Sequence, residues 1–413
     1  MASNDSTTSK NNPNGHSWWF SGDKVLWVII AMMAVISVLV VYSSTAKMAY
    51  DANTIRSTSD FLKQQFLILF IGITLLFVAH KINYHIVRHF TPAAYWISIG
   101  LTLLAYALGV TTNGAARWIP IGGFQFQPSE ALKVATILNL ARALTIRQNV
   151  IDRLRIVPSF NPFLWALPGQ KKIWREGTMP ILFPVFLACG VIVSAHTSSA
   201  VLLFVASFVV MIIGRVKWSE LGKIILIVVA AGAMYMMVGA GRSETASNRV
   251  STWIELLTTD RTKTNINDLT DTERSMIAIH NGGVFGEGAG HSAMRVEMIH
   301  PESDYAFAFF VEEYGLILSL IVLMLYLWLF FRAMEISREC RTAFPALMVL
   351  GLAVMITCQA LLHIMVTVNL TPETGQTLPL ISRGGSSLFF TSIALGLILS
   401  VSRQNREVAA QER

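Results

Sequence analysis

Charged side chains are scarce in this sequence. Asp, Glu, Lys and Arg make up 14% of its 413 residues, whereas 53% are hydrophobic and the mean hydropathy is +0.54. A soluble domain of this length carries charge on about a quarter of its residues. The composition therefore excludes an ordinary soluble domain and predicts an all-α polytopic membrane protein.

Cysteine and cofactor-binding motifs are also lacking. The three cysteines, Cys189, Cys340 and Cys358, form no C-x-x-C pair, so the sequence indicates neither a metal knuckle nor a disulfide framework. It contains no P-loop, no dinucleotide-binding fingerprint and no H-E-x-x-H. The glycine-rich stretch 282–290 follows no predicted strand and is predicted to face outward, so it is not a nucleotide loop. We therefore expect no organic cofactor and no dedicated metal site.

Long apolar segments, by contrast, recur along the chain. About ten of them, several short, each predict a membrane helix, which needs about 20 apolar residues to span a bilayer. They are Val25–Ser43, Phe61–His80, Ala93–Val110, Leu132–Leu144, Pro180–Ala195, Ala200–Gly214, Leu221–Gly239, Tyr305–Phe331, Phe344–Val368 and Leu388–Val401.

The basic residues indicate the orientation. Lys and Arg gather in alternate short loops, and cytoplasmic loops carry such an excess of positive charge. Both termini are therefore predicted in the cytoplasm. The segments predicted outside are 44–60, 111–130, 240–304 and 369–387. The net charge of +7 follows from the loop residues, so we expect no nucleic-acid partner.

One transmembrane domain is expected over residues 23–403. Residues 1–22 are polar and predict a disordered cytoplasmic tail, and residues 404–413 a second cytoplasmic tail. No A-x-A cleavage site follows the first apolar run, which favours a retained helix over a signal peptide. The cytoplasmic loop 147–178 combines Trp and Lys and favours contact with anionic lipid, whereas the large outer loop 240–304 is net acidic.

Ionisable residues near the outer ends of these helices are the first functional candidates. Arg117 precedes a predicted helix start, and Glu130 and Lys133 lie one turn apart just inside it, after Ser129 as a cap. One interpretation is a surface ion pair with Arg117 reaching a lipid phosphate. Because a Lys is unexpected on the outer side, a Lys133 that points into a polar cavity is favoured.

A second cluster lies where the large loop meets the eighth apolar run. Glu302 and Asp304 precede a helix predicted from Tyr305, and Glu312 and Glu313 lie inside it. The first two can simply cap this helix, although a capping carboxylate can also be catalytic. Apolar residues flank the Glu312-Glu313 pair on both sides, so at least one of these carboxylates should face the protein interior or a polar cavity.

The third cluster is the segment 369–390, NLTPETGQTLPLISRGGSSLFF, which its Pro and Gly residues prevent from forming one helix. Backbone N–H groups around Gly384, Gly385, Ser386 and Ser387 can form an anion-binding nest at the next helix start. The alternative is an ordinary outer hairpin. In the preceding apolar run, Gln359 is by default an interhelical hydrogen-bonding residue.

Together these motifs resemble the SEDS (shape, elongation, division and sporulation) family over nearly the whole chain. The pattern comprises GAxRWI…QPSE…K, GGxxGxGxG, D-aromatic-x-F-A…EE-aromatic-G and TGxTLPLIS-x-GGSS. Its Q-T-L-P variant resembles the division members more than the elongation members.

The resemblance implies a SEDS-like fold of ten helices with a large loop between the seventh and eighth. It also implies an inverting peptidoglycan glycosyltransferase that polymerises lipid II during cell division, in the bacterial cytoplasmic (inner) membrane with its active site outside. The partners implied are lipid II, a class B penicillin-binding protein, other divisome membrane proteins and membrane lipid. A divalent cation, Mg²⁺ or Mn²⁺, can share the diphosphate charge, although no ligand set in the sequence establishes one.

The resemblance also implies roles for individual residues. Asp304 corresponds to the catalytic carboxylate, and Glu302, Glu312, Glu313 and Gln359 are expected to support it. The substrate and diphosphate group is expected to bind Arg117, Glu130, Lys133, Gly384, Gly385, Ser386 and Ser387.

Three departures from the family pattern stand out. The spacing from Pro301-Glu302 to Asp304 is shorter than usual, and Arg383 replaces a Tyr. The segment His196-Thr197-Ser198-Ser199 replaces a Pro-Asp-x-Gly-Thr motif and so loses its acid.

A different class of function, a lipid II flippase, would use the same embedded charges and broken helices. It would need polar residues through the full membrane depth, whereas the ionisable residues here cluster towards the outer half, which favours an enzyme.

Overall fold

Each of the ten apolar runs coincides with a helix in the computed structural model. The structure describes residues 21–44, 58–108, 110–112, 115–121, 124–153, 174–194, 196–238, 242–258, 269–294, 298 and 303–412. The ten helices are α1 (Lys24–Ser44), α3 (Thr58–Lys81), α4 (Tyr84–Leu108), α5 (Pro128–Ile146), α7 (Met179–Val193), α8 (Thr197–Ile213), α9 (Trp218–Val238), α12 (Ala306–Arg338), α13 (Ala343–Thr367) and α14 (Gly385–Gln411).

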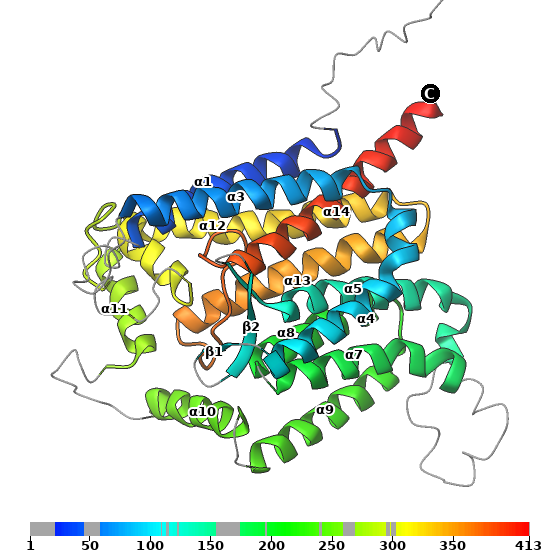
Figure 1. Cartoon of the computed structure of the whole chain (residues 1–413), viewed down its shortest axis with the longest axis horizontal. Coiled ribbons are helices and arrows are strands. Elements are labelled where there is room, and N and C mark those ends of the chain that lie inside the picture. The colour runs from blue at the N-terminus through cyan, green and yellow to red at the C-terminus, as the bar shows by residue number, and fades with distance from the viewer. Residues whose placement is uncertain are drawn as a thin grey trace, which may run out of the picture.

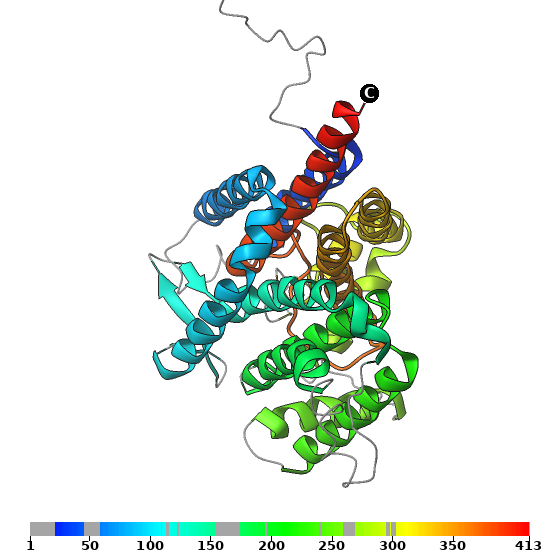
Figure 2. The same cartoon turned by 90° about the vertical axis from the view of Figure 1, so that its right-hand side faces the viewer.

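Eight described helices are long and apolar enough to cross a membrane. Of the other two, α8 is apolar but shorter, and α5 carries Glu130, Lys133 and Arg142 within 19 residues. The helices run alternately in opposite directions. In Figure 1, α1, α3, α12 and α14 lie along one side of the bundle, α13, α5, α8 and α7 lie below them, and α9 lies at the opposite edge. Figure 2 shows the same separation from the end of the bundle.

One short sheet corrects the all-α expectation. The strands β1 (Val110–Thr112), β2 (Ala115–Ile121) and β3 (Phe124–Phe126) pair antiparallel in the order β1-β2-β3. This segment joins α4 to α5. The ring centroids of Phe126 and Phe390 lie 5.8 Å apart, so the sheet is attached to α14. β-Branched and aromatic residues favour such strands locally, but the prediction treated the segment only as an outer loop.

Two further helices lie inside the large outer loop, α10 (Arg242–Thr258) and α11 (Asp271–Gly282). A capping box starts α11, in which Thr270 and Glu273 each bind the other's backbone N–H. The Trp253 indole donates to the carbonyl of Asn369 (3.1 Å), and the Thr272 hydroxyl donates to Glu373 Oε1 (2.9 Å). Both loop helices are therefore tied to the segment between α13 and α14.

The helix α12 is interrupted at Gly315, whose φ is +79°. The carbonyls of Glu312 and Glu313 consequently accept hydrogen bonds from Glu287 N (2.9 Å) and Gly288 N (3.0 Å). Contact is close here, because a Cβ at Gly286 would lie 2.3 Å from the Glu313 carbonyl oxygen. The glycines of this stretch thus allow the loop to pack closely against α12.

Both ends of the described part of the chain lie at the end of the bundle predicted to be cytoplasmic. Arg332 near the end of α12 donates to Asp23 just before α1, at 2.6 and 2.8 Å. Residues 404–411, which were predicted to form a tail, continue α14 to Gln411. Most of the 147–178 loop and nearly all of the tail 1–22 lie outside the described residues.

Candidate functional site

Four helix N-termini meet at the end of the bundle predicted to face outward. They belong to α5, α8, α12 and α14, with Gln127, His196, Tyr305 and Gly384 as their N-cap residues. The segment after α13 passes between them. An N-terminus carries about half a positive elementary charge and free N–H groups, so this end of the bundle favours an anion.

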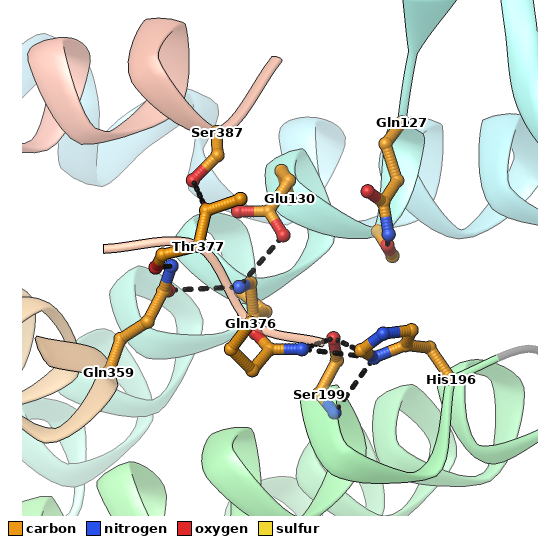
Figure 3. A network of polar contacts seen from close by, with 10 residues as sticks. Gln127, Glu130, His196, Ser199, Gln359, Gln376, Thr377 and Ser387 are labelled. Atoms are coloured by element: carbon orange, nitrogen blue, oxygen red, sulfur yellow. Dashed lines mark hydrogen bonds and ion pairs between the residues drawn. The ribbon is translucent and has the colours of Figure 1, made fainter. Parts of the chain in front are cut away.

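Lys133 is buried at this end, with 1% of its surface exposed. Its Nζ lies 2.9 Å from Glu130 Oε1 and donates to Gln359 Oε1 at 3.1 Å, and Gln359 Nε2 donates to the Thr377 carbonyl at 3.0 Å (Figure 3). The interpretation of Glu130 and Lys133 as a surface pair is therefore wrong. Gln359 does link elements as expected, from α13 to α5 and to the segment before α14.

The Gly-Gly-Ser-Ser turn begins α14. Gly384 is the extended N-cap, and the Leu388 N–H donates to its carbonyl at 2.9 Å. Ser386 and Ser387 are buried, and Ser387 Oγ accepts from Thr377 Oγ1 at 3.0 Å. Nearby, Arg383 donates to Gln64 Oε1 of α3 at 3.1 Å. The turn is thus an inward-facing helix start and not a freely exposed hairpin.

Asp304 is half-buried in a turn directly before α12. The N-cap residue of this helix is Tyr305, whose side chain makes no capping hydrogen bond, and Asp304 lies one residue before it. Ser303 donates to Asp304 Oδ1 at 3.0 Å, and Ser382 Oγ donates to the Ser303 carbonyl at 3.0 Å. The segment before α14 therefore fixes the turn that carries the carboxylate. Glu302 lies outside the described residues.

Gly375 brings Asp304 and His196 into one space. Its φ of +61° is left-handed, and the position that a Cβ would occupy lies 3.7 Å from Asp304 Oδ2 and 3.9 Å from His196 Nε2. A glycine suits this position because it adopts the left-handed backbone conformation without strain and leaves the space between Asp304 and His196 open. The two ionisable side chains border the same point from α12 and α8.

His196 is a site residue that the sequence interpretation missed. Its Nδ1 accepts from the Ser199 N–H (3.2 Å) and lies 2.6 Å from Ser199 Oγ and 3.0 Å from Gln376 Nε2 (Figure 3). In the sequence, His196 stands out only as part of the segment that replaces the Pro-Asp-x-Gly-Thr motif and loses its acid. The available signal was a histidine at the start of an apolar helix with a serine three residues later, which is the spacing of an N-cap and its partner.

His363 holds the two sides of this site together. It is 1% exposed; its Nε2 accepts from the Phe307 N–H of α12 (3.4 Å), and its Nδ1 is 2.7 Å from the Gln376 carbonyl. A backbone N–H can only donate, so the proton of this imidazole is on Nδ1 and points to Gln376. One side chain thus binds both the start of α12 and the neighbour of Gly375.

A small pocket adjoins His196. It is lined by Thr102, Ala105, Tyr106, Gln127, Pro128, Ser129, Ile192 and His196. Its polar side is formed by the first residues of α5 and by His196. The pocket is small, with room for about one water molecule.

Glu312 and Glu313 are both fully or nearly fully buried, at 0% and 1% exposure. Glu313 Oε1 accepts from the Gly290 N–H (2.9 Å) and from Ser43 Oγ (2.5 Å), and Glu312 accepts from Ser292 Oγ and from Asn281 Nδ2 (3.3 Å). The expectation that one carboxylate faces the interior is confirmed for both. They bind the glycine-rich loop to α12.

Tyr305 and Glu373 form a further polar contact beside Asp304. The Tyr305 hydroxyl donates to Glu373 Oε1 at 2.9 Å. Burial, together with the Glu373 charge, raises the pKa of the Tyr305 phenol well above its usual value. The phenol is therefore a hydrogen-bond donor and not a base. Arg117 lies on β2, and its side chain is outside the described part of the chain.

Comparison with known proteins adds to this geometry. A profile of the FtsW/RodA/SpoVE family of cell cycle proteins matches residues 23–407. The probable peptidoglycan glycosyltransferase FtsW of Geobacter sp. (strain M18) is 28% identical, with 92% of this chain and 98% of that protein covered. Stage V sporulation protein E of Bacillus subtilis (strain 168) is 27% identical, with 97% and 100% covered.

Solved structures show the same fold. A chain of a peptidoglycan synthase complex that coordinates polymerization and crosslinking matches with a TM-score of 0.66 at 22% identity, covering 94% of this chain and 99% of that one. The rod shape determining protein RodA of Thermus thermophilus matches with a TM-score of 0.59 at 24% identity, covering 94% and 98%. With the profile spanning nearly its full length, this chain belongs to the FtsW/RodA/SpoVE family, the SEDS proteins that its motifs indicated.

Proposed function

We propose that this chain is a peptidoglycan glycosyltransferase that polymerises lipid II during cell division, on the outer side of the bacterial cytoplasmic membrane. One observation carries the proposal. The Asp304 carboxylate lies directly before α12, and its Oδ2 borders a space shared with Gly375 and His196, where four helix N-termini meet. Transfer of a sugar from a diphosphate requires a base for the attacking hydroxyl and positive potential for the leaving diphosphate. The names of the FtsW relatives point to the same activity.

In the proposed reaction, the 4-hydroxyl of the acceptor lipid II attacks the anomeric carbon of the growing chain. The O–H bond breaks and its proton passes to Asp304. The new C–O bond forms as the bond to the diphosphate breaks, with inversion at the anomeric carbon. Undecaprenyl diphosphate leaves with the electron pair. The carboxylate thus acts as the general base.

The leaving diphosphate needs positive charge. We assign this role to Arg117, whose guanidinium suits bidentate phosphate contacts, and to the helix N-termini around Gly384 and Ser386. Lys133 already has Glu130 as its counter-charge at 2.9 Å. We therefore assign the Lys133–Glu130 pair chiefly to holding the segment around Thr377 beside the substrate. Mg²⁺ or Mn²⁺ remains a proposed helper for the diphosphate.

The partner proposed is a class B penicillin-binding protein, alongside other divisome membrane proteins. Glycan strands must be cross-linked to form a wall, and the structural relative with a TM-score of 0.66 is part of a complex that coordinates polymerization and crosslinking. The outer helices α10 and α11, which bind the segment before α14, offer such a partner a route to the site.

The test uses the purified full chain, with its transpeptidase partner, on lipid II in detergent. Replacing the base should lower glycan synthesis by about 10²–10⁴-fold in Asp304→Asn, with an unchanged unfolding temperature. Asp271→Asn is the matched control, because Asp271 lies in the same outer loop, where it pairs with Arg274 (3.1 Å); it should retain activity.

Normal synthesis by Asp304→Asn would overturn the mechanism. Absence of product from wild type and variant, together with transfer of lipid II across liposome membranes by both, would replace the enzyme with a flippase.

A further inference from the structure

His196 has its ring proton on Nε2. Nδ1 accepts from the backbone N–H of Ser199 at 3.2 Å, and an amide N–H has no lone pair to offer in return. Nδ1 therefore carries no proton while this N-cap is formed. The side chain is consequently a neutral N–H donor.

The Nε2 of this ring borders the space beside Asp304. The Cβ position of Gly375 lies 3.9 Å from His196 Nε2 and 3.7 Å from Asp304 Oδ2. An acceptor carboxylate and a donor imidazole thus face one point. A hydroxyl group matches this pair, because it donates one hydrogen bond and accepts another.

Three buried contacts hold the imidazole in this orientation. The side-chain Nε2 of Gln376 lies 3.0 Å from His196 Nδ1 and donates to Ser199 Oγ at 2.9 Å. The backbone carbonyl of Gln376 lies 2.7 Å from His363 Nδ1. Gln376, Ser199 and His363 are each at most 4% exposed. The ring is therefore preorganised, and its donor does not need to be reoriented when a ligand arrives.

We propose that His196 and Asp304 together bind the acceptor hydroxyl of the substrate. This rests on the proposed function. Asp304 accepts the hydroxyl proton, and His196 Nε2–H donates to the hydroxyl oxygen without giving up its own proton. The oxygen keeps its other lone pair for the new C–O bond. Where the family motif has an acid, this chain thus has a neutral donor to the substrate.

The decisive variant is His196→Asn. Asn is among the best N-cap residues, and its Oδ1 can accept from the Ser199 N–H as Nδ1 does, whereas the distant Nε2 donor is lost. We expect an unchanged unfolding temperature and about a tenfold lower kcat/KM for lipid II, the loss of one net hydrogen bond. His291→Asn is the matched control, because His291 is exposed on the loop 288–291, and it should behave as wild type.

The pH profile separates a donor from a base. Among the residues that the structure describes, the titratable groups that border the same space or the adjoining pocket are Asp304 and Tyr106. If His196 only donates, the acid limb of kcat/KM belongs to Asp304 and keeps its position in His196→Asn. A shifted or missing acid limb would make His196 the base and overturn the inference, and so would a wild-type kcat/KM. If wild type itself makes no glycan while the proteins are folded, the proposed function fails instead.

Discussion

At the scale of single residues, the buried Lys133–Glu130 ion pair is important for the stability of the bundle. Lys133 is 1% exposed and bonds both Glu130 and Gln359. Removing one partner of such a pair leaves an unpaired buried charge, which costs about 3–5 kcal/mol. Replacing both partners with apolar or neutral residues costs much less.

We therefore expect Glu130→Gln and Lys133→Met each to lower the unfolding free energy by about 3–5 kcal/mol, and the double variant to recover most of it. Unfolding in detergent measures the three values as a double-mutant cycle. If the effects of the two substitutions simply add, the pair is not coupled. If the folded double variant lacks polymerase activity, the charge has a role beyond stability.

Residues of the site were predictable to different degrees. Asp304, Lys133 and Glu130 were found because a charge beside an apolar run stands out in a sequence. His196 was missed because its importance comes from Ser199, Gln376 and Gly375, and only the fold brings Gly375 and Gln376 to it. Polar contacts across about 180 residues leave no local pattern.

At the scale of elements, the loop 282–290 and the break in α12 depend on each other. Gly286 and Gly290 share a φ of +82°, but only at Gly286 would a Cβ meet a backbone atom, the Glu313 carbonyl oxygen at 2.3 Å. Around Gly290 there is open space. The two positions therefore separate backbone strain from steric overlap.

Gly290→Ala should lower the unfolding free energy by about 1–2 kcal/mol, the cost of a left-handed conformation for an L-residue. Gly286→Ala should cost clearly more, because the loop must also move off α12. Thermal unfolding of the two variants in the same detergent gives the comparison. Equal losses would show that the close approach does not matter.

The helices were largely predictable, because apolar runs of membrane length give a strong signal. The sheet was not, since β1 and β3 have only three residues each, too few for an alternating pattern to stand out. The break at Gly315 was also missed. It reflects the approach of Gly286, about 30 positions earlier in the chain, and not a local preference.

At the scale of the whole molecule, Asp23 connects the beginning and the end of the described chain. It is 2% exposed and contacts Arg332 of α12 (2.6 Å) and Arg406 of α14 (3.6 Å). Burial alone would raise the pKa of Asp23, but the hydrogen bonds from Arg332 and Leu26 and the charges of both arginines together lower it.

A lowered pKa means that this contact stabilises the fold above the ordinary value of 3.8 and loses its effect as the pH falls through the folded-state value. We expect Asp23→Asn to unfold more easily at pH 7, by about 1.5–3 kcal/mol for charge-assisted hydrogen bonds. The difference from wild type should disappear below the folded-state value. A difference that persists there would assign the effect to packing.

The break at Gly315 also has a mechanical consequence. Nine residues, 306–314, form a short outer rod that is bonded to the glycine-rich loop through the carbonyls of Glu312 and Glu313, while residues 316–338 form a separate, longer rod. The same loop also accepts hydrogen bonds from the start of the longer rod, at the Gly283 carbonyl from Leu316 N (3.0 Å) and at the Val284 carbonyl from Ile317 N (3.5 Å), so it bridges the break on both sides. A displacement of the loop is therefore transmitted to the turn of Asp304 and to the membrane part of α12 together, and the loop and both segments move as one unit.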